Sequence, residues 1–149
     1  MKRLFIFCLT ITILLPCLAM GKESPIGNAK TSNGDVVVIR NAKQIPLSIG
    51  DKIFPNDTIR TGTASSAGII FEDNTILSLG PDSEILIDKY VFAPEKGIFS
   101  MIASMAKGTA SYLSGIIGKQ SPESVKFQTP DATIGIRGAH FLVKVDCCR

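Results

Sequence analysis

The sequence contains few residues that could bind a metal ion or act as a catalytic histidine. His140 is the single histidine, and Cys147 and Cys148 are the cysteines nearest to it. A zinc site would need these three side chains and a fourth ligand, but adjacent cysteines lack the usual two-residue spacer. His140 also lies in a stretch that alternates apolar and polar residues, where a half-exposed structural histidine is expected. We therefore predict no metal centre and no bound cofactor.

Acid–base catalysis would have to use carboxylates, which cluster at Glu72-Asp73 and at Asp82 and Glu84. Each group lies in or beside a predicted turn, where acidic side chains usually cap the backbone and stay solvated. A hydrolase would need two of them opposed across a cleft, and no feature of the sequence places them so. The sequence also lacks the motifs of calcium loops, phosphate-binding loops and nucleophile elbows. We expect a protein that is not an enzyme.

Arg137 is the strongest polar candidate for binding. It interrupts an apolar run between Gly135 and Gly138, and these glycines let the backbone bend or approach another strand closely. An arginine held there could donate a fork of hydrogen bonds to backbone carbonyls, or to a carboxylate such as Asp131 or Asp73. Two interpretations stay open: an internal arginine that stabilises a turn, which is the favoured one, and an arginine that binds a partner.

Residues 1–21 have the pattern of a secretory signal peptide. Lys2-Arg3 forms a basic start, Leu4 to Leu15 is mostly apolar, and Ala19-Met20-Gly21 places small residues before a cleavage point. The apolar run is shorter than the roughly 20 residues of a spanning helix. Cleavage is therefore favoured over an uncleaved N-terminal membrane anchor. Lipidation of Cys17 is disfavoured because Pro16 occupies the place of the small residue that precedes a lipidated cysteine.

Loss of the signal peptide would leave a nearly neutral chain. Without Lys2 and Arg3, 14 of the 16 basic residues remain against 13 acidic ones, a net charge of +1. Nucleic-acid binding is not expected, because it needs a concentrated basic face. Cys147 and Cys148 would form a strained ring if they paired with each other. In an oxidising compartment either could instead form an intermolecular disulfide; the alternative is that residues 147–149 are a frayed tail.

The rest of the chain predicts an all-β fold in a single domain of short strands. Residues 22–33 are polar and are interpreted as a flexible linker, so that the domain spans residues 34–146. Apolar runs rich in Val, Ile, Thr and Phe then recur between turn formers, which is typical of a sandwich-like or a coiled, solenoid-like β architecture. Asp73-Asn74 should form the tight turn of a hairpin. The predicted strands cover 36–39, 45–49, 58–61, 67–71, 75–79 and 84–92.

Two segments leave the architecture open. Residues 98–117 carry a weak helical stripe, but glycines and serines would weaken a helix there, so we predict two strands and one short helical turn near Ser114 to Lys119. Gly50 to Ile53 and Asn56 to Ile59 share a turn-then-strand rhythm. They could form successive rungs of a coiled β structure.

Five short motifs resemble motifs of the FecR domain family and follow one another in the family's order. The resemblance extends over Gly34 to Val145. In the last of them the family usually has threonine where this chain has Ala139. The motifs are Ile49-Gly50-Asp51-Lys52-Ile53, Asn56-Asp57-Thr58-Ile59-Arg60-Thr61-Gly62, Ser66-Ala67 with Ile70-Phe71-Glu72-Asp73-Asn74-Thr75, Leu79-Gly80-Pro81-Asp82-Ser83, and Thr129-Pro130-Asp131-Ala132-Thr133-Ile134-Gly135-Ile136-Arg137-Gly138.

The resemblance implies a periplasmic, predominantly β domain without an established enzymatic activity. The best-understood relatives span the inner membrane, sense a loaded outer-membrane transporter and control a cytoplasmic sigma factor. Here only three residues precede the hydrophobic segment, so we do not expect this chain to bind a sigma factor itself. We expect it to be more similar to the stand-alone exported members of the family. The partner would be an unidentified envelope protein, of the outer or the inner membrane.

Three functions compete at this point. The first is a non-catalytic, exported interaction or signalling module that binds another envelope protein through strand edges or through the loops near Arg137. The second is a carbohydrate or peptidoglycan binder, although the chain has no Trp and only Tyr90 and Tyr112 to form an aromatic platform. The third is a hydrolase that uses the carboxylates above. The candidate structural or interaction residues are Arg137, Gly135, Gly138, Asp73, Asn74, Thr129 and Pro130.

Overall fold

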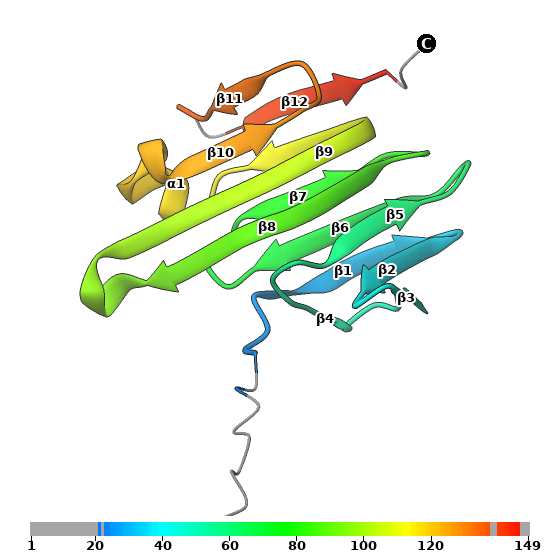
Figure 1. Ribbon diagram of the computed structural model, residues 1–149, viewed down its shortest axis with the longest axis horizontal. Coiled ribbons are helices and arrows are strands. Elements are labelled where there is room, and N and C mark those ends of the chain that lie inside the picture. The colour runs from blue at the N-terminus through cyan, green and yellow to red at the C-terminus, as the bar shows by residue number, and fades with distance from the viewer. Residues whose placement is uncertain (1–20, 22, 138–139, 147–149) are drawn as a thin grey trace, which may run out of the picture.

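The computed structural model describes Gly21, residues 23–137 and residues 140–146, and strands are the main regular structure in this part of the chain (Figure 1). The predicted signal peptide and the Cys147-Cys148 pair therefore lie outside the described residues. One short helix, α1 (Ile116–Gln120), and two 3-10 turns (Pro94–Lys96 and Pro122–Ser124) complete the elements. The strands are β1 (Gly27–Asn33), β2 (Val36–Arg40), β3 (Lys43–Pro46), β4 (Lys52–Ile53), β5 (Thr58–Thr61), β6 (Ser66–Phe71), β7 (Ile76–Leu79), β8 (Glu84–Ala93), β9 (Ile98–Leu113), β10 (Val125–Gln128), β11 (Thr133–Gly135) and β12 (His140–Val145).

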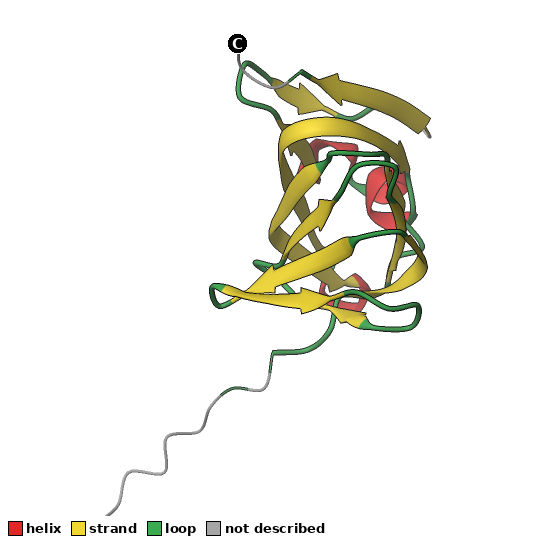
Figure 2. Cartoon of the chain, turned by 90° about the vertical axis from the view of Figure 1, so that its right-hand side faces the viewer, coloured by secondary structure: helices red, strands yellow, loops and turns green. Residues whose placement is uncertain are grey.

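Four long, bent strands form the centre of the fold, and each runs antiparallel to its neighbours. β1 continues into β2, β5 into β6, and β7 into β8, while β9 is the fourth. The register is continuous along each bent pair: β9 places Lys107 opposite Glu84 of β8 and Ala110 opposite Leu79 of β7. Because all four strands bend, the sheet curls, and Figure 2 shows it wrapping partly around its own interior.

Glycines mark the four bends: Gly34, Gly62, Gly80 and Gly108. Gly108 has φ of +94°, which L side chains rarely adopt, and a Cβ at this position would collide with Ser83. The Ser83 hydroxyl fills that space instead, and it accepts a 2.9 Å hydrogen bond from the Thr109 N–H. The strands can therefore pass each other closely at the corner, which is what folds one sheet into two packed halves.

The outer edges of the curled sheet carry the remaining strands. β3 pairs with β2 and β4 pairs with β1. At the other end β9 accepts two strands on its free edge: β10 runs parallel to its first half, and β12 runs antiparallel to its second half. β11 pairs with β10 as a hairpin.

The core lies inside the curl, and strict alternation along the strands supplies it. Ile59 of β5, Ile69 of β6, Leu77 of β7 and Ile85 of β8 are fully buried, while the residues between them face outward. Burial of each such side chain contributes about 1.5–3 kcal/mol. The outward side chains are thus free to form surfaces on the convex side.

The structure confirms the all-β fold, the helical turn and the Asp73-Asn74 hairpin. β6 pairs with β7 in antiparallel register, and Asn74 adopts a left-handed φ of 64° at the turn. α1 lies where the short helical turn is expected. The predicted strand at 45–49 is shorter and begins earlier, as β3.

Three expectations are wrong. Residues 22–33 are not all linker, because Gly27–Asn33 form β1, whose backbone pairs with β6 and β4 while its polar side chains mostly face water. Residues 98–113 are one strand rather than two, since the positive φ of Gly108 bends β9 without ending it. The Gly50 to Ile53 and Asn56 to Ile59 segments are not successive rungs, because β4 pairs with β1 whereas β5 pairs with β2 and β8.

Candidate interaction surface

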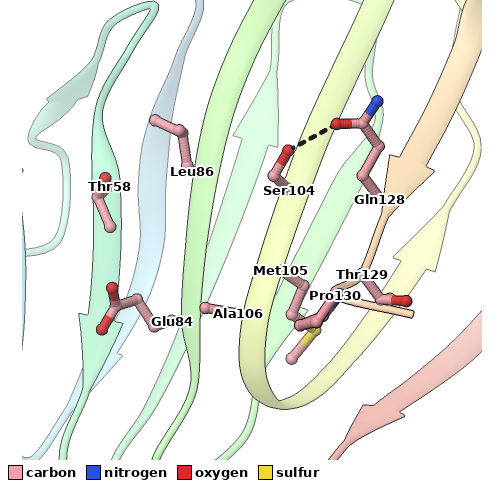
Figure 3. A pocket seen from close by; sticks show the side chains of 9 residues that line it. All are labelled: Thr58, Glu84, Leu86, Ser104, Met105, Ala106, Gln128, Thr129 and Pro130. Carbon is pink, nitrogen blue, oxygen red and sulfur yellow. Dashed lines mark hydrogen bonds between the residues drawn. The ribbon is translucent and has the colours of Figure 1, made fainter. Parts of the chain in front are cut away.

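A groove of about 400 Å³ crosses the convex face of the half-sheet formed by β5, β8, β9 and β10 (Figure 3). Its lining residues come from four strands and from the turn that follows β10. They are Thr58, Glu84, Leu86, Ser104, Met105, Ala106, Gln128, Thr129 and Pro130.

Strand register explains why these residues meet. Thr58 lies opposite Leu86, Leu86 opposite Ser104, and Ser104 opposite Gln128. Directly opposite residues point to the same face, and the alternate residues along each strand are buried. The four side chains therefore form one row across the outside of the sheet. A bulge between Glu84 and Ile85 leaves Ala106 without a partner in β8, and this small, exposed residue keeps the groove open.

The turn after β10 forms one wall of the groove. The Thr129 N–H donates to the Ala132 carbonyl at 2.8 Å, and the Thr129 hydroxyl accepts from the Ala132 N–H at 3.1 Å. Pro130 stands inside this closed loop, where its fixed φ stiffens the turn. Thr129 and Pro130, both candidates from the sequence, are thus held rigidly at the groove.

Hydrogen-bonding groups of both kinds line the groove. Glu84 is paired with Arg60 at 2.8 Å on the exposed face. The Ser104 hydroxyl bonds to Asp88 and lies 3.1 Å from the Gln128 Oε1 (Figure 3). The lining therefore offers hydroxyl, amide and carboxylate groups for recognition of a polar surface.

Asp73 lies away from this groove, and its environment is that of a structural residue. It is fully buried. Its carboxylate accepts from the Thr75 hydroxyl at 2.7 Å, the Tyr90 hydroxyl at 3.0 Å and the Ile117 N–H at 3.1 Å. Burial raises the pKa of Tyr90, and the nearby negative charge of Asp73 adds to this shift. Asp73 thus ties the hairpin to β8 and to the start of α1, while Asn74 is exposed at the turn.

Arg137 lies on the surface, beside a second groove of about 250 Å³ between β11 and β12. Neither Asp131 nor Asp73 forms an ion pair with it, and within the described residues its guanidinium has no hydrogen-bonded partner. Gly135 lines the same groove, and a Cβ added at this position would meet no atom within 4 Å. Gly138 lies outside the described residues. This geometry does not support an arginine that stabilises the turn from inside.

The carboxylates considered for hydrolysis have separate partners and, in the described part of the chain, are not shown facing one another across a cleft. Asp73 is buried in the hairpin, Glu84 is paired with Arg60, and Asp82 accepts a 3.1 Å hydrogen bond from the Thr63 hydroxyl on an exposed turn. His140 bonds to the Ser111 hydroxyl at 2.9 Å. Across residues 23–137 and 140–146, no three His, Cys, Asp or Glu side chains are close enough to hold a metal ion.

Sequence reasoning missed the groove itself. Ser104 and Gln128 are ordinary polar positions of alternating strands, and they lie 24 positions apart in the sequence. Only the parallel pairing of β10 with β9 brings them together. Among the candidates from the sequence, Thr129, Pro130 and Glu84 line the groove, but Glu84 is a candidate for catalysis rather than for binding.

A comparison with protein-family models decides the family. The FecR model, described as FecR protein, matches residues 57–147, which is more than half of the chain. The chain belongs to the FecR family. The FecR match begins at Asp57, so β1 to β4 precede it, and it contains the whole of the groove lining. No curated protein and no solved structure gives a significant match.

FecR membership indicates a regulatory signalling domain. Within the described residues, none of the helices has the length and apolar character needed to cross a membrane.

Proposed function

We propose that this chain is an exported, non-catalytic signalling module of the cell envelope that binds another envelope protein. The proposal rests on the groove across β5, β8, β9 and β10, where register aligns the outward side chains of four strands beside a rigid turn. FecR membership supports the regulatory role. The signal-peptide pattern of residues 1–21 supports export to the periplasm.

A partner surface that carries both apolar and hydrogen-bonding groups fits this groove best. Its walls offer Ser104, Gln128 and Thr129 as hydrogen-bonding groups, and Leu86, Ala106 and Pro130 as apolar contacts. Interfaces of this kind combine satisfied polar contacts with a few buried apolar ones. The lining includes no aromatic side chain, so the glycan-binding alternative has less support from the geometry.

Site-specific photo-crosslinking in living cells tests the proposal. A photoreactive residue would replace Ala106, which is exposed inside the groove, or Ser78, which is exposed on the outer face of β7 in the other half-sheet. We expect one envelope protein to be crosslinked from position 106 and not from position 78. The additional substitution Gln128→Arg should abolish this crosslink, because it fills the groove with a charged side chain while the fold persists.

Two results would count against the proposal. Equal crosslinking from both positions would show that contact is not specific to the groove. Retention of the chain by purified peptidoglycan, lost on Gln128→Ala, would assign the groove to glycan binding instead.

A further inference from the structure

The free edges of the described sheet differ in how well they are protected against pairing with another chain. β3 carries Pro46, which cannot donate to a neighbouring strand, while β4 and β11 are only two and three residues long. β12 is six residues long, contains no proline and pairs on one side only, with β9. Natural proteins seldom leave a regular, apolar edge strand uncovered.

Apolar side chains remain partly uncovered on both faces of β12. Phe141, Val143 and Val145 point toward the core and pack against it, yet all three are only half-buried. Leu142 points to the outer face and is 75% exposed. One further strand beside β12 would cover both sets at once.

The groove between β11 and β12 continues this edge. Consecutive residues from both strands line it, from Ile134 to Arg137 and from His140 to Val143. Consecutive residues point to alternating faces, so the groove runs along the edge of β12 rather than over one face. At its end lie two basic side chains, Arg137 and His140.

We propose that a second copy of this chain adds its own β12 to this edge, antiparallel and related by a two-fold axis at Val143. Opposite residues in an antiparallel pair point to the same face, so odd-numbered residues must face odd-numbered ones. A two-fold axis at either Leu142 or Val143 satisfies this condition. The two registers differ in the charges that they bring together.

Charge complementarity selects the axis at Val143. With the axis at Leu142, His140 would face Lys144 of the second copy. With the axis at Val143, His140 faces Asp146 of the second copy and Lys144 faces Leu142 of the second copy. Asp146 of the second copy then enters the groove end, beside Arg137. Its contact within its own chain is a 3.3 Å pair with Lys144, and both side chains are largely exposed, so this pair is weak and readily exchanged.

This dimer would not use the groove across β5, β8, β9 and β10, so it does not depend on the proposed function. It would join the half-sheet that contains β12 in one copy to the same half-sheet of the second copy, as in other symmetric dimers that share a sheet. Arg137 would thus be an interface residue whose partner belongs to a second copy.

Sedimentation velocity of the purified chain, in reductant so that no disulfide links copies, tests the proposal. We expect a dimer whose dissociation constant rises by about tenfold or more with either Asp146→Arg or Arg137→Asp, since each change places like charges together twice. The double variant should restore association, because the pair is then reversed. Glu95→Arg, the same charge change on the exposed turn between β8 and β9, should have no effect.

Disulfide trapping gives a second readout. In a chain with Cys147→Ser and Cys148→Ser, the change Val143→Cys should yield a covalent dimer on mild oxidation, because the two positions face each other at the axis, whereas Glu95→Cys should not. A chain that stays monomeric with its circular dichroism intact would overturn the proposal. So would a dimer that is unaffected by the two single charge changes.

Discussion

The carboxylate of Asp73, in the turn between β6 and β7, accepts a 3.0 Å hydrogen bond from the hydroxyl of Tyr90, in β8, inside the fold. The Tyr90 hydroxyl also accepts a 2.9 Å hydrogen bond from the Asp73 N–H. The same carboxylate accepts from the first turn of α1 at Ile117. One acidic side chain thus fixes the hairpin, the long strand β8 and the helix relative to each other.

Tyr90→Phe should lower the free energy of unfolding by about 1–3 kcal/mol, because it leaves the buried Asp73 short of a donor. The ring stacks on Phe71 and would remain in place, so the change isolates the hydroxyl. Urea unfolding measures the effect. Tyr112→Phe is the matched control and should cost less, since the hydroxyl of Tyr112 meets the Met101 sulfur at 3.6 Å, which is a weak acceptor.

Asp73→Asn should lower the free energy of unfolding by about 3 kcal/mol. The amide nitrogen would replace one carboxylate oxygen, so that its hydrogens would face groups that donate hydrogen bonds to that oxygen in the native protein. Loss of the Ile117 contact should also loosen α1. Urea unfolding and amide hydrogen exchange at α1 would show both effects. Asp82→Asn, on an exposed turn, should leave stability within about 0.5 kcal/mol; an equal loss for both variants would contradict the structural role of Asp73.

Alkaline pH should destabilise the fold through its two tyrosines. Burial raises the pKa of Tyr90 and of Tyr112. The unfolded chain therefore loses these protons first, near its ordinary pKa of about 10. Stability is fully present below that pH and falls as the pH rises above it. In an absorbance titration, tyrosinate should form together with the loss of circular dichroism; tyrosinate formation in a folded chain would contradict this expectation.

Gly108→Ala should destabilise the corner by about 3 kcal/mol, from backbone strain and from collision with Ser83. Gly50→Ala separates the two causes. Its φ of +91° is close to the +94° of Gly108, but an added Cβ would meet no atom within 4 Å. This control should cost about 1 kcal/mol. Thermal unfolding of both variants measures the difference in stability. Equal losses of stability would show that the close approach between Gly108 and Ser83 does not contribute to the effect.

Local patterns in the sequence determined the β class, most strand positions and the tight turns. Alternation along 58–61 and 67–71 directs one face of each strand to a core, and Asn74 tolerates the left-handed backbone of its turn. These are interactions between near neighbours in the chain, so they can be predicted without knowledge of the partner strands. The motifs that resemble FecR domains also lie on these turns and strands.

Pairing between distant segments decided the rest. β1 is a strand because β6 and β4 satisfy its backbone, although its own side chains are polar. β9 continues through Gly108 because β7 and β8 hold one edge, while β10 and β12 hold the other. The groove at Ser104 and Gln128, and the exposed position of Arg137, follow from the same pairings. Hydrogen bonds between strands far apart in sequence leave no periodic trace in either strand alone, so only the tertiary structure could reveal them.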